Sequence, residues 1–336
     1  MSQRFRILIC PKTAEFCVLT PNQFLLRGSN SRITEVRLLC AATAPEFDCR
    51  GLPTVTYVPT NPARNKNNQP VILGIWKLGE SIHVSSSTQL SLAQPADAVG
   101  SPRWDYVIKQ AVDGSDQLEG RRQVLQSIAA AAGANHPNLI ALLDASTASN
   151  SPYMVMPRLE GETMQWHLQS EAQKPLPVAL WLIRQAAQAL DALHNIGWIH
   201  GDVKPENAVV GPRGHLTLVD LGFASRIHTL PNHHFRGTPA YAAPETLAGK
   251  MAAIPAMDIF SLGRVLWHWI TRTEQVSQIL LEPVADLVEQ MVSREPNERP
   301  AAAEVVQQLL RLEIETLGRH IGPSRSIPMS PVRRVA

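Results

Sequence analysis

The sequence predicts an α+β fold of two unequal lobes, a small strand-rich lobe followed by a larger helical one. Short apolar runs broken by turn residues dominate the first half of the chain. Apolar residues at helical spacing dominate the second half. A compact polar loop, IHGDVKPENAVV at residues 199–210, is placed at the junction of the two parts. Strands first and helices afterwards, with such a loop at their junction, indicate a cleft between two lobes.

Residues 1–60 are predicted to be a small β-rich segment, which either forms a unit of its own or extends the first lobe. Runs such as Phe5–Cys10 and Val36–Cys40 are rich in strand-forming residues and are separated by Pro, Asn and Gly. The polar stretch 61–70 has prolines near both ends, which is typical of a linker. No C-x-x-C spacing joins the cysteines, so we expect reduced thiols and no zinc site. The four cysteines are Cys10, Cys17, Cys40 and Cys49.

Residues 71–156 are predicted to form the strand-rich lobe. One helix is expected at Leu118–Ala132, ended by His136-Pro137-Asn138. The loop 94–103 separates the last two of the strands that precede the helix. The predicted strands are Ile72–Leu78, Ile82–Val84, Gln89–Ala93, Tyr106–Lys109, LIALLDA (139–145) and PYMVM (152–156).

Residues 160–315 are predicted to form the helical lobe, so that the two lobes together make one domain, 71–315. Leu180, Ile183, Ala187 and Leu190 recur at helical spacing, and Gly197 provides a stop signal. Further apolar helices are expected at Ile259–Ile270 and Glu304–Leu312. The basic tail, 316–336, is predicted to be disordered.

Composition limits the classes of function. The 336 residues are 44% hydrophobic and 18% charged, which allows a substantial core. The net charge of +2 argues against general nucleic-acid binding through phosphate neutralisation. We see neither a secretory segment nor an apolar run of about 18 residues that could span a bilayer. A cytoplasmic protein without a membrane span is the expectation.

The polar loop combines groups that suit phosphate and metal chemistry. Asp202, Lys204 and Asn207 lie within six residues, with apolar residues on both sides. LVDLGFA then places a second carboxylate, Asp220, beside a glycine, and a turn between short strands can bring it back to the loop. Upstream, Lys109 ends the predicted strand Tyr106–Lys109. Carboxylate and amide oxygens suit Mg²⁺, and ammonium groups suit phosphates.

Downstream, three further motifs follow in order: GTPAYAAPE (237–245), DIFSLG (258–263) and ERP (298–300). Together with the loop and Lys109, this order resembles that of a eukaryotic-type (bacterial-like) Ser/Thr protein kinase over about residues 76–312. The resemblance implies a bilobal protein-kinase-like fold that binds ATP and Mg²⁺ and phosphorylates Ser or Thr hydroxyls of protein substrates.

The resemblance also implies roles for individual residues. Asp202 would orient the substrate hydroxyl, Lys204 would neutralise the transferred phosphoryl group, and Lys109 would bind the α- and β-phosphates. Asn207 and Asp220 would hold Mg²⁺. Further nucleotide contacts are expected from Ile82, Ser85, Leu90, Val107, Met156, Pro157, Leu159 and Val209. Structural matches are an ion pair between Glu245 and Arg299, and Asp258 as the acid that binds the backbone of the catalytic loop.

Three departures from the family pattern stand out. IHVSSSTQL has His83, Ser85 and Thr88 where the phosphate-covering loop has glycines. The helix after Lys109 offers only an early Glu119 as a lysine partner. His-Gly-Asp replaces His-Arg-Asp.

These departures keep two alternatives open. A pseudokinase that binds ATP or serves as a scaffold would explain the lost glycines and the missing glutamate. A small-molecule phosphotransferase would explain His-Gly-Asp, but such enzymes normally lack Lys two residues after the Asp, GTPAYAAPE and DIFSLG.

Overall fold

A computed structural model describes residues 71–98, 100–114, 117–148, 152–170, 173–230, 235–273 and 277–320. The chain divides into two units, 1–59 and 60–336, and all of the described residues lie in the second. The strands and cysteines predicted within 1–60 and the predicted linker, 61–70, lie outside the described residues.

As predicted, strands dominate the described elements up to Pro157 and helices dominate after it, although short strands also lie among these helices. The strands are β1 (Ile72–Leu73), β2 (Trp76–Val84), β3 (Thr88–Pro95), β4 (Tyr106–Ala111), β5 (Asp144–Ser146), β6 (Tyr153–Pro157), β7 (Glu162–Thr163), β8 (Trp198–Ile199), β9 (Ala208–Val210), β10 (Leu216–Leu218) and β11 (Ser225–Arg226). The α-helices are α1 (Gln117–Gly133), α2 (Met164–Gln169), α3 (Leu176–Asn195), α4 (Pro244–Ala248), α5 (Pro255–Ile270), α6 (Gln278–Met291) and α7 (Ala302–His320). Short 3-10 helices are η2 (Pro205–Asn207), η3 (Leu221–Phe223) and η4 (Pro296–Glu298).

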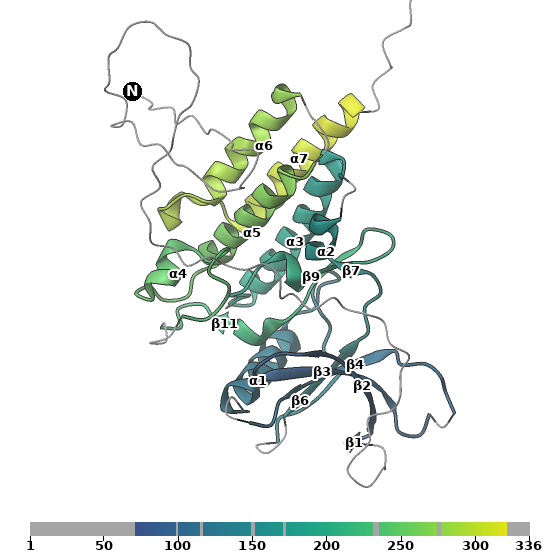
Figure 1. Cartoon of the computed structure of the whole chain (residues 1–336). Coiled ribbons are helices and arrows are strands. Elements are labelled where there is room, and N and C mark those ends of the chain that lie inside the picture. Colours follow the sequence, from purple (N-terminus) through teal and green to yellow (C-terminus); the bar gives the residue numbers. More distant parts are fainter. Residues whose placement is uncertain are drawn as a thin grey trace, which may run out of the picture. The chain divides into compact units, whose positions relative to one another are not determined.

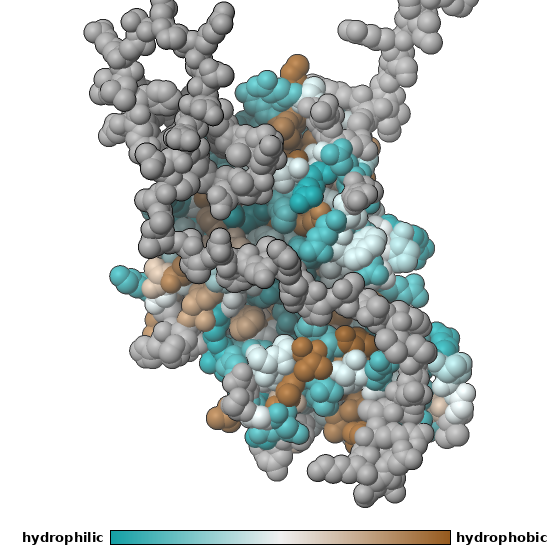
Figure 2. Space-filling model, viewed as in Figure 1, coloured by the Kyte–Doolittle hydropathy of each residue, from teal (hydrophilic) through white to brown (hydrophobic). Residues whose placement is uncertain are grey.

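The first lobe is one antiparallel sheet with α1 packed against it. Its six strands have the order β1-β2-β3-β4-β6-β5. In Figure 1 this sheet and α1 lie together in blue, apart from the long helices in green and yellow. Figure 2 shows hydrophobic side chains in brown among hydrophilic ones over this strand-rich lobe. Its exposed large apolar residues include Ile72, Ile75, Ile82, Val84, Leu118 and Leu125.

The predicted strand Ile72–Leu78 is wrong in its bounds. Gly74 adopts φ +58°, a conformation that glycine takes without strain, and the chain reverses there so that Leu73 pairs with Trp76. From Trp76 the next strand runs without a break through the predicted Ile82–Val84. A hairpin therefore replaces the single strand because one glycine permits a two-residue turn.

The predicted strand LIALLDA (139–145) is also wrong over most of its length. Only its last two residues belong to β5, because the preceding residues bond to two different sheets. The Ile140 N–H donates to the carbonyl of Leu218, whereas the Leu143 N–H donates to that of Val155. This segment therefore bridges the lobes instead of lying in one ladder.

The second lobe is built on α3, whose apolar face was predicted from Leu180, Ile183, Ala187 and Leu190. All four are buried, with exposed fractions of 0%. The helix ends where predicted, with Gly197 at φ +79° just beyond it. Helices α5 and α7 pack beside α3. Helix α6, which lies between them in the sequence, was not predicted. Helix α7 continues past the predicted domain end at residue 315 to His320.

A single large hydrophobic core connects the two lobes. It runs from Leu92 and Val107 of the sheet through Val124 of α1 to Leu190 of α3 and Leu309 of α7. Within the described part of the chain, no helix is both long enough and apolar enough to cross a membrane.

Candidate active site

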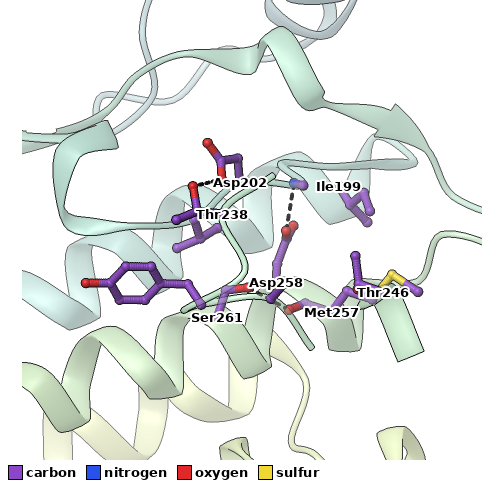
Figure 3. A pocket seen from close by; sticks show the side chains of 11 residues that line it. Ile199, Asp202, Thr238, Thr246, Met257, Asp258 and Ser261 are labelled. Carbon is purple, nitrogen blue, oxygen red and sulfur yellow. Dashed lines mark hydrogen bonds between the residues drawn. The ribbon is translucent and has the colours of Figure 1, made fainter. Parts of the chain in front are cut away.

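The loop after β8 is held in place by one buried acid from α5. Asp258 is 1% exposed, and its carboxylate accepts the backbone N–H groups of His200 at 2.7 Å and Gly201 at 2.9 Å, besides Nε2 of His194 at 2.9 Å. Figure 3 shows Asp258 reaching from α5 to this backbone beside Ile199. The contact predicted for Asp258 is thereby confirmed.

We predict that Asp258 gives the fold a pH-dependent stability. Burial raises the pKa of its carboxyl, but the hydrogen bond and charge of His194, together with His200 and the Gly201 N–H, lower it overall. A carboxyl with a lowered folded-state pKa stabilises the fold above its unfolded pKa, about 4, and loses this contribution as pH falls through its folded pKa. Asp258→Asn should therefore lower the free energy of unfolding by about 3 kcal/mol at neutral pH.

Urea unfolding at several pH values checks this prediction. The difference between the wild type and Asp258→Asn should shrink as pH falls below about 4. Asp97→Asn, at an exposed acid, is the control and should change the free energy of unfolding little. A difference that is constant with pH would contradict the assignment.

Gly201 explains why His-Gly-Asp stands in this loop. Its φ of +78° disfavours other residues, and a Cβ there would lie 2.5 Å from the carbonyl oxygen of Phe223. The backbone of the loop at Gly201 therefore lies directly against the backbone of η3. Glycine at this position is a packing requirement of this chain, which accounts for the sequence feature shared with small-molecule phosphotransferases.

Asp202 is the centre of a cluster of hydrogen bonds. It is 5% exposed. Its Oδ1 accepts from the hydroxyl of Thr238 at 2.8 Å, and its Oδ2 lies 2.8 Å from Nζ of Lys204 and 3.1 Å from Nδ2 of Asn207. Nζ of Lys204 also donates to the Thr238 hydroxyl at 2.8 Å. Figure 3 shows Asp202 and Thr238 pointing toward one another above a cavity of about 30 Å³. The structure therefore brings these loop residues together with the GTPAYAAPE segment.

The second acid lies beside the predicted strand lysine. Nζ of Lys109 is 2.5 Å from Oδ1 of Asp220 and 3.3 Å from the hydroxyl of Ser127. Lys109 is 4% exposed, whereas 44% of the Asp220 side chain stays accessible. Asp220 itself has φ +61°, a strained conformation that is typical of functional sites. Lys109 is therefore a buried partner of an acid that stays partly accessible to solvent.

The ammonium group of Lys109 keeps Asp220 ionised. Desolvation by the surrounding protein raises the pKa of this carboxyl, but the charge and hydrogen bond of Lys109 outweigh it, aided by the Gly222 N–H and the charge of His200. The pKa of Asp220 is lowered to about 2. The carboxylate is therefore ionised at every physiological pH.

Sequence reasoning missed the residue of α1 that faces Lys109, which is Ser127. Glu119, Gln123 and Ser127 follow one another at intervals of four residues, so they share one face of the helix. That spacing was the sequence signal from which Ser127 could have been placed on the face toward Lys109. Since Ser127 is neutral, the only acid bonded to Lys109 in the described part of the chain is Asp220.

The same helix face connects the turn between β2 and β3 with the residue before the GTPAYAAPE segment. The Ser87 hydroxyl donates to Oε1 of Gln123 at 3.2 Å, and Nε2 of Gln123 donates to Glu119 at 3.2 Å. Glu119 in turn forms an ion pair with Arg236, just before the GTPAYAAPE segment. Gly120 permits this closeness, because a Cβ there would lie 1.9 Å from the Ser87 carbonyl oxygen. The turn is therefore fastened to α1.

Most of the remaining predicted nucleotide contacts lie in the strands or pack against the large core. Val107 and Met156 pair across β4 and β6 and belong to the large core, and Leu90 and Leu159 pack against it. Pro157 ends β6, and Val209 lies in β9. Ile82 is 43% exposed. The hydroxyl of Ser85 is engaged within its own turn, where it accepts from the Thr88 N–H at 2.9 Å.

Asn207 and Asp220 provide oxygen donors of the kind that Mg²⁺ prefers. The Nδ2 group of Asn207 is used for the backbone carbonyl and side chain of Asp202, which leaves its Oδ1 as the potential ligand. No three His, Cys, Asp or Glu side chains within the described residues make a complete metal site. Two protein oxygens fit a cation that takes its other ligands from water and phosphates, as Mg²⁺ commonly does.

Comparison with known proteins agrees with this geometry. A family model of the protein kinase domain matches residues 102–280. The hormonally up-regulated neu tumor-associated kinase of Homo sapiens is 29% identical over 280 residues, which cover 77% of this chain and 37% of that protein. Sperm motility kinase 2B of Mus musculus is 28% identical over 193 residues, 52% of this chain and 40% of that protein.

A third relative shows a higher identity over a shorter stretch. The cAMP-dependent protein kinase catalytic subunit of Arthrobotrys oligospora is 34% identical over 155 residues, 46% of this chain and 28% of that protein. The chain spans less than half of the length of each of these three relatives.

Proposed function

Since the chain belongs to the protein kinase family, we propose that it transfers the γ-phosphoryl group of ATP to serine and threonine hydroxyls of proteins, with Mg²⁺. Residues 71–315 would be the catalytic domain. The observation that carries this proposal is the clustering of Asp202, Lys204 and Asn207 around Thr238, next to the pair of Lys109 and Asp220.

The geometry supports a separate role for each of these side chains. Asp202 is in place to accept a hydrogen bond from a substrate hydroxyl at Oδ1, the atom that now accepts from Thr238. Lys204, one contact away, would neutralise charge on the transferred group. Lys109 would hold the α- and β-phosphates. The contact of Lys204 with the Thr238 hydroxyl supports the proposed Ser/Thr specificity.

Asn207 and Asp220 would hold the divalent cation, which when bound neutralises phosphate charge and orients the triphosphate. The lowered pKa of Asp220 supports this role, because a metal ligand must be deprotonated.

Transfer of label from ATP tests the proposal. With Mg²⁺ and generic basic proteins, the full chain should label itself or those proteins, with the label on serine or threonine. Asp202→Asn and Asp220→Asn should each lower labelling by at least about a hundredfold. Labelling no higher than that of the two variants would exclude the enzyme.

One observation favours a second candidate, a nucleotide-binding module with little or no transfer. Ser127 faces Lys109 where the family has a glutamate, and the phosphate-covering turn lacks its glycines. In that case, ATP and Mg²⁺ together should raise the thermal unfolding midpoint although no label is transferred.

A further inference from the structure

A groove lies between α1 and the β8–β11 pair, on the side of α1 away from the sheet. Its volume is about 510 Å³, which is enough for several side chains. It is separate from the cluster around Asp202, since the two sites share no lining residue. The side chains that define it are Leu118, Arg121, Arg122, Leu125, Trp198 and Arg226.

Three arginines line the groove. Arg121 and Arg122 come from α1 and Arg226 comes from β11, and none of its described lining residues is acidic. Arg226 is held in position, because Nη1 donates to the carbonyl of Ile196 at 3.2 Å and its guanidinium lies 4.6 Å from the centre of the Trp198 ring. Guanidinium groups bind carboxylates through paired hydrogen bonds, so this arrangement selects an anionic ligand.

The groove also offers apolar surface of the kind that a peptide side chain would cover. Leu118 is 80% exposed and Leu125 is 40% exposed, and they lie about two helical turns apart on α1. Trp198 provides a buried aromatic floor. A free phosphate or a nucleic-acid backbone would use the arginines but would leave the two leucines uncovered.

We propose that this groove binds an acidic peptide segment of a partner protein, with aliphatic side chains between its carboxylates. Arg122 and Arg226 would pair with the acids, and Leu118, Leu125 and Trp198 would bury the aliphatic side chains. Charge complementarity and apolar surface in one groove together identify this class of ligand.

Occupancy of the groove has a consequence for the active site that rests on the proposed function. The opposite face of α1 carries Ser127 against Lys109, and Gln123 against Ser87. A segment that contacts both α1 and β11 would hold the helix against the second lobe. We therefore expect a bound acidic segment to raise the rate of phosphoryl transfer.

The binding test uses the full chain and a fluorescein-labelled peptide rich in aspartate and glutamate with two leucines. Fluorescence anisotropy should show saturable binding that weakens as salt increases. The double variant Arg122→Glu with Arg226→Glu should weaken binding at least tenfold. Arg213→Glu, at an exposed arginine outside the groove, is the matched control and should leave binding unchanged.

A second variant keeps the test decisive if loss of the contact between Arg226 and Trp198 impairs folding. Leu118→Asp changes an 80% exposed residue and should weaken peptide binding while the thermal unfolding midpoint stays unchanged. A control peptide with asparagine and glutamine in place of the acids should bind at least tenfold more weakly.

Other results would overturn the proposal. Equal binding to the wild type, the double variant and Leu118→Asp would place the peptide elsewhere, and absence of binding would exclude an acidic peptide. Binding of a short RNA or of vesicles containing phosphatidylserine, with no binding of the peptide, would assign the groove to another class of ligand. Intact binding without faster transfer would contradict only the expected activation, whereas transfer without binding would leave the proposed function standing.

Discussion

Replacing Lys109 by methionine is expected to lower phosphoryl transfer by about two to three orders of magnitude. The substitution removes the ammonium group that lies 2.5 Å from Asp220 and keeps an unbranched side chain in the buried site. It also removes the two largest effects that oppose the desolvation of Asp220, so that the pKa of this carboxyl rises from about 2. The proposed phosphate contact and the control of the Asp220 pKa are therefore both lost in one variant.

Steady-state kinetics across pH distinguish these two effects. Loss of phosphate contact lowers kcat/KM at every pH, whereas the raised pKa of Asp220 moves the acid limb of the residual activity to higher pH. Lys250→Met, at an exposed lysine after α4, is the matched control and should behave as the wild type. Activity of Lys109→Met close to that of the wild type would contradict the role assigned to Lys109.

Replacing Glu245 by glutamine is expected to lower the free energy of unfolding by about 3–5 kcal/mol. Nη1 and Nη2 of Arg299 lie 2.5 and 2.9 Å from the two carboxylate oxygens of Glu245, which confirms the predicted ion pair. The Arg299 side chain is 0% exposed and also donates to the carbonyl of Ala256 at 2.9 Å. Removing the carboxylate therefore leaves a buried positive charge without its counter-ion.

Urea unfolding monitored by tryptophan fluorescence checks this expectation. Asp105→Ala breaks the pair of Arg103 and Asp105, whose side chains are 77% and 52% exposed, and should change stability by no more than about 1 kcal/mol. A similar loss of unfolding free energy in both variants would show that burial does not increase the contribution of the Glu245 pair to stability.

The elements that were predicted well are those whose periodicity is set by one continuous buried face. Helix α3 follows the spacing of Leu180 to Leu190, because this whole face packs in the core. The strand predicted for LIALLDA was wrong for the opposite reason. Its backbone partners, Leu218 and Val155, belong to two different sheets and lie far apart in the sequence. Local apolar content cannot reveal where such partners lie.

The candidate site shows the same limit. The grouping of Asp202, Lys204 and Asn207 follows from their closeness in the sequence, and the structure brings them together. The partners of Lys109 depend on the rotation of α1 against the sheet. The sequence offered only Glu119, which lies too early on the helix for that role, and no partner of Lys109 was predicted. In the structure Glu119 pairs with Arg236, and Ser127 occupies the position beside Lys109.

The contact between Gly201 and Phe223 has a consequence for motion. With no side chain at Gly201, the main chain of the catalytic loop lies directly against the main chain that follows Asp220. Two backbones in close contact cannot shift separately without opening a void or colliding. We therefore expect any movement of Asp220 and Phe223 to move the loop as well. Asp202 and Asp220 would then change position together, in one concerted step.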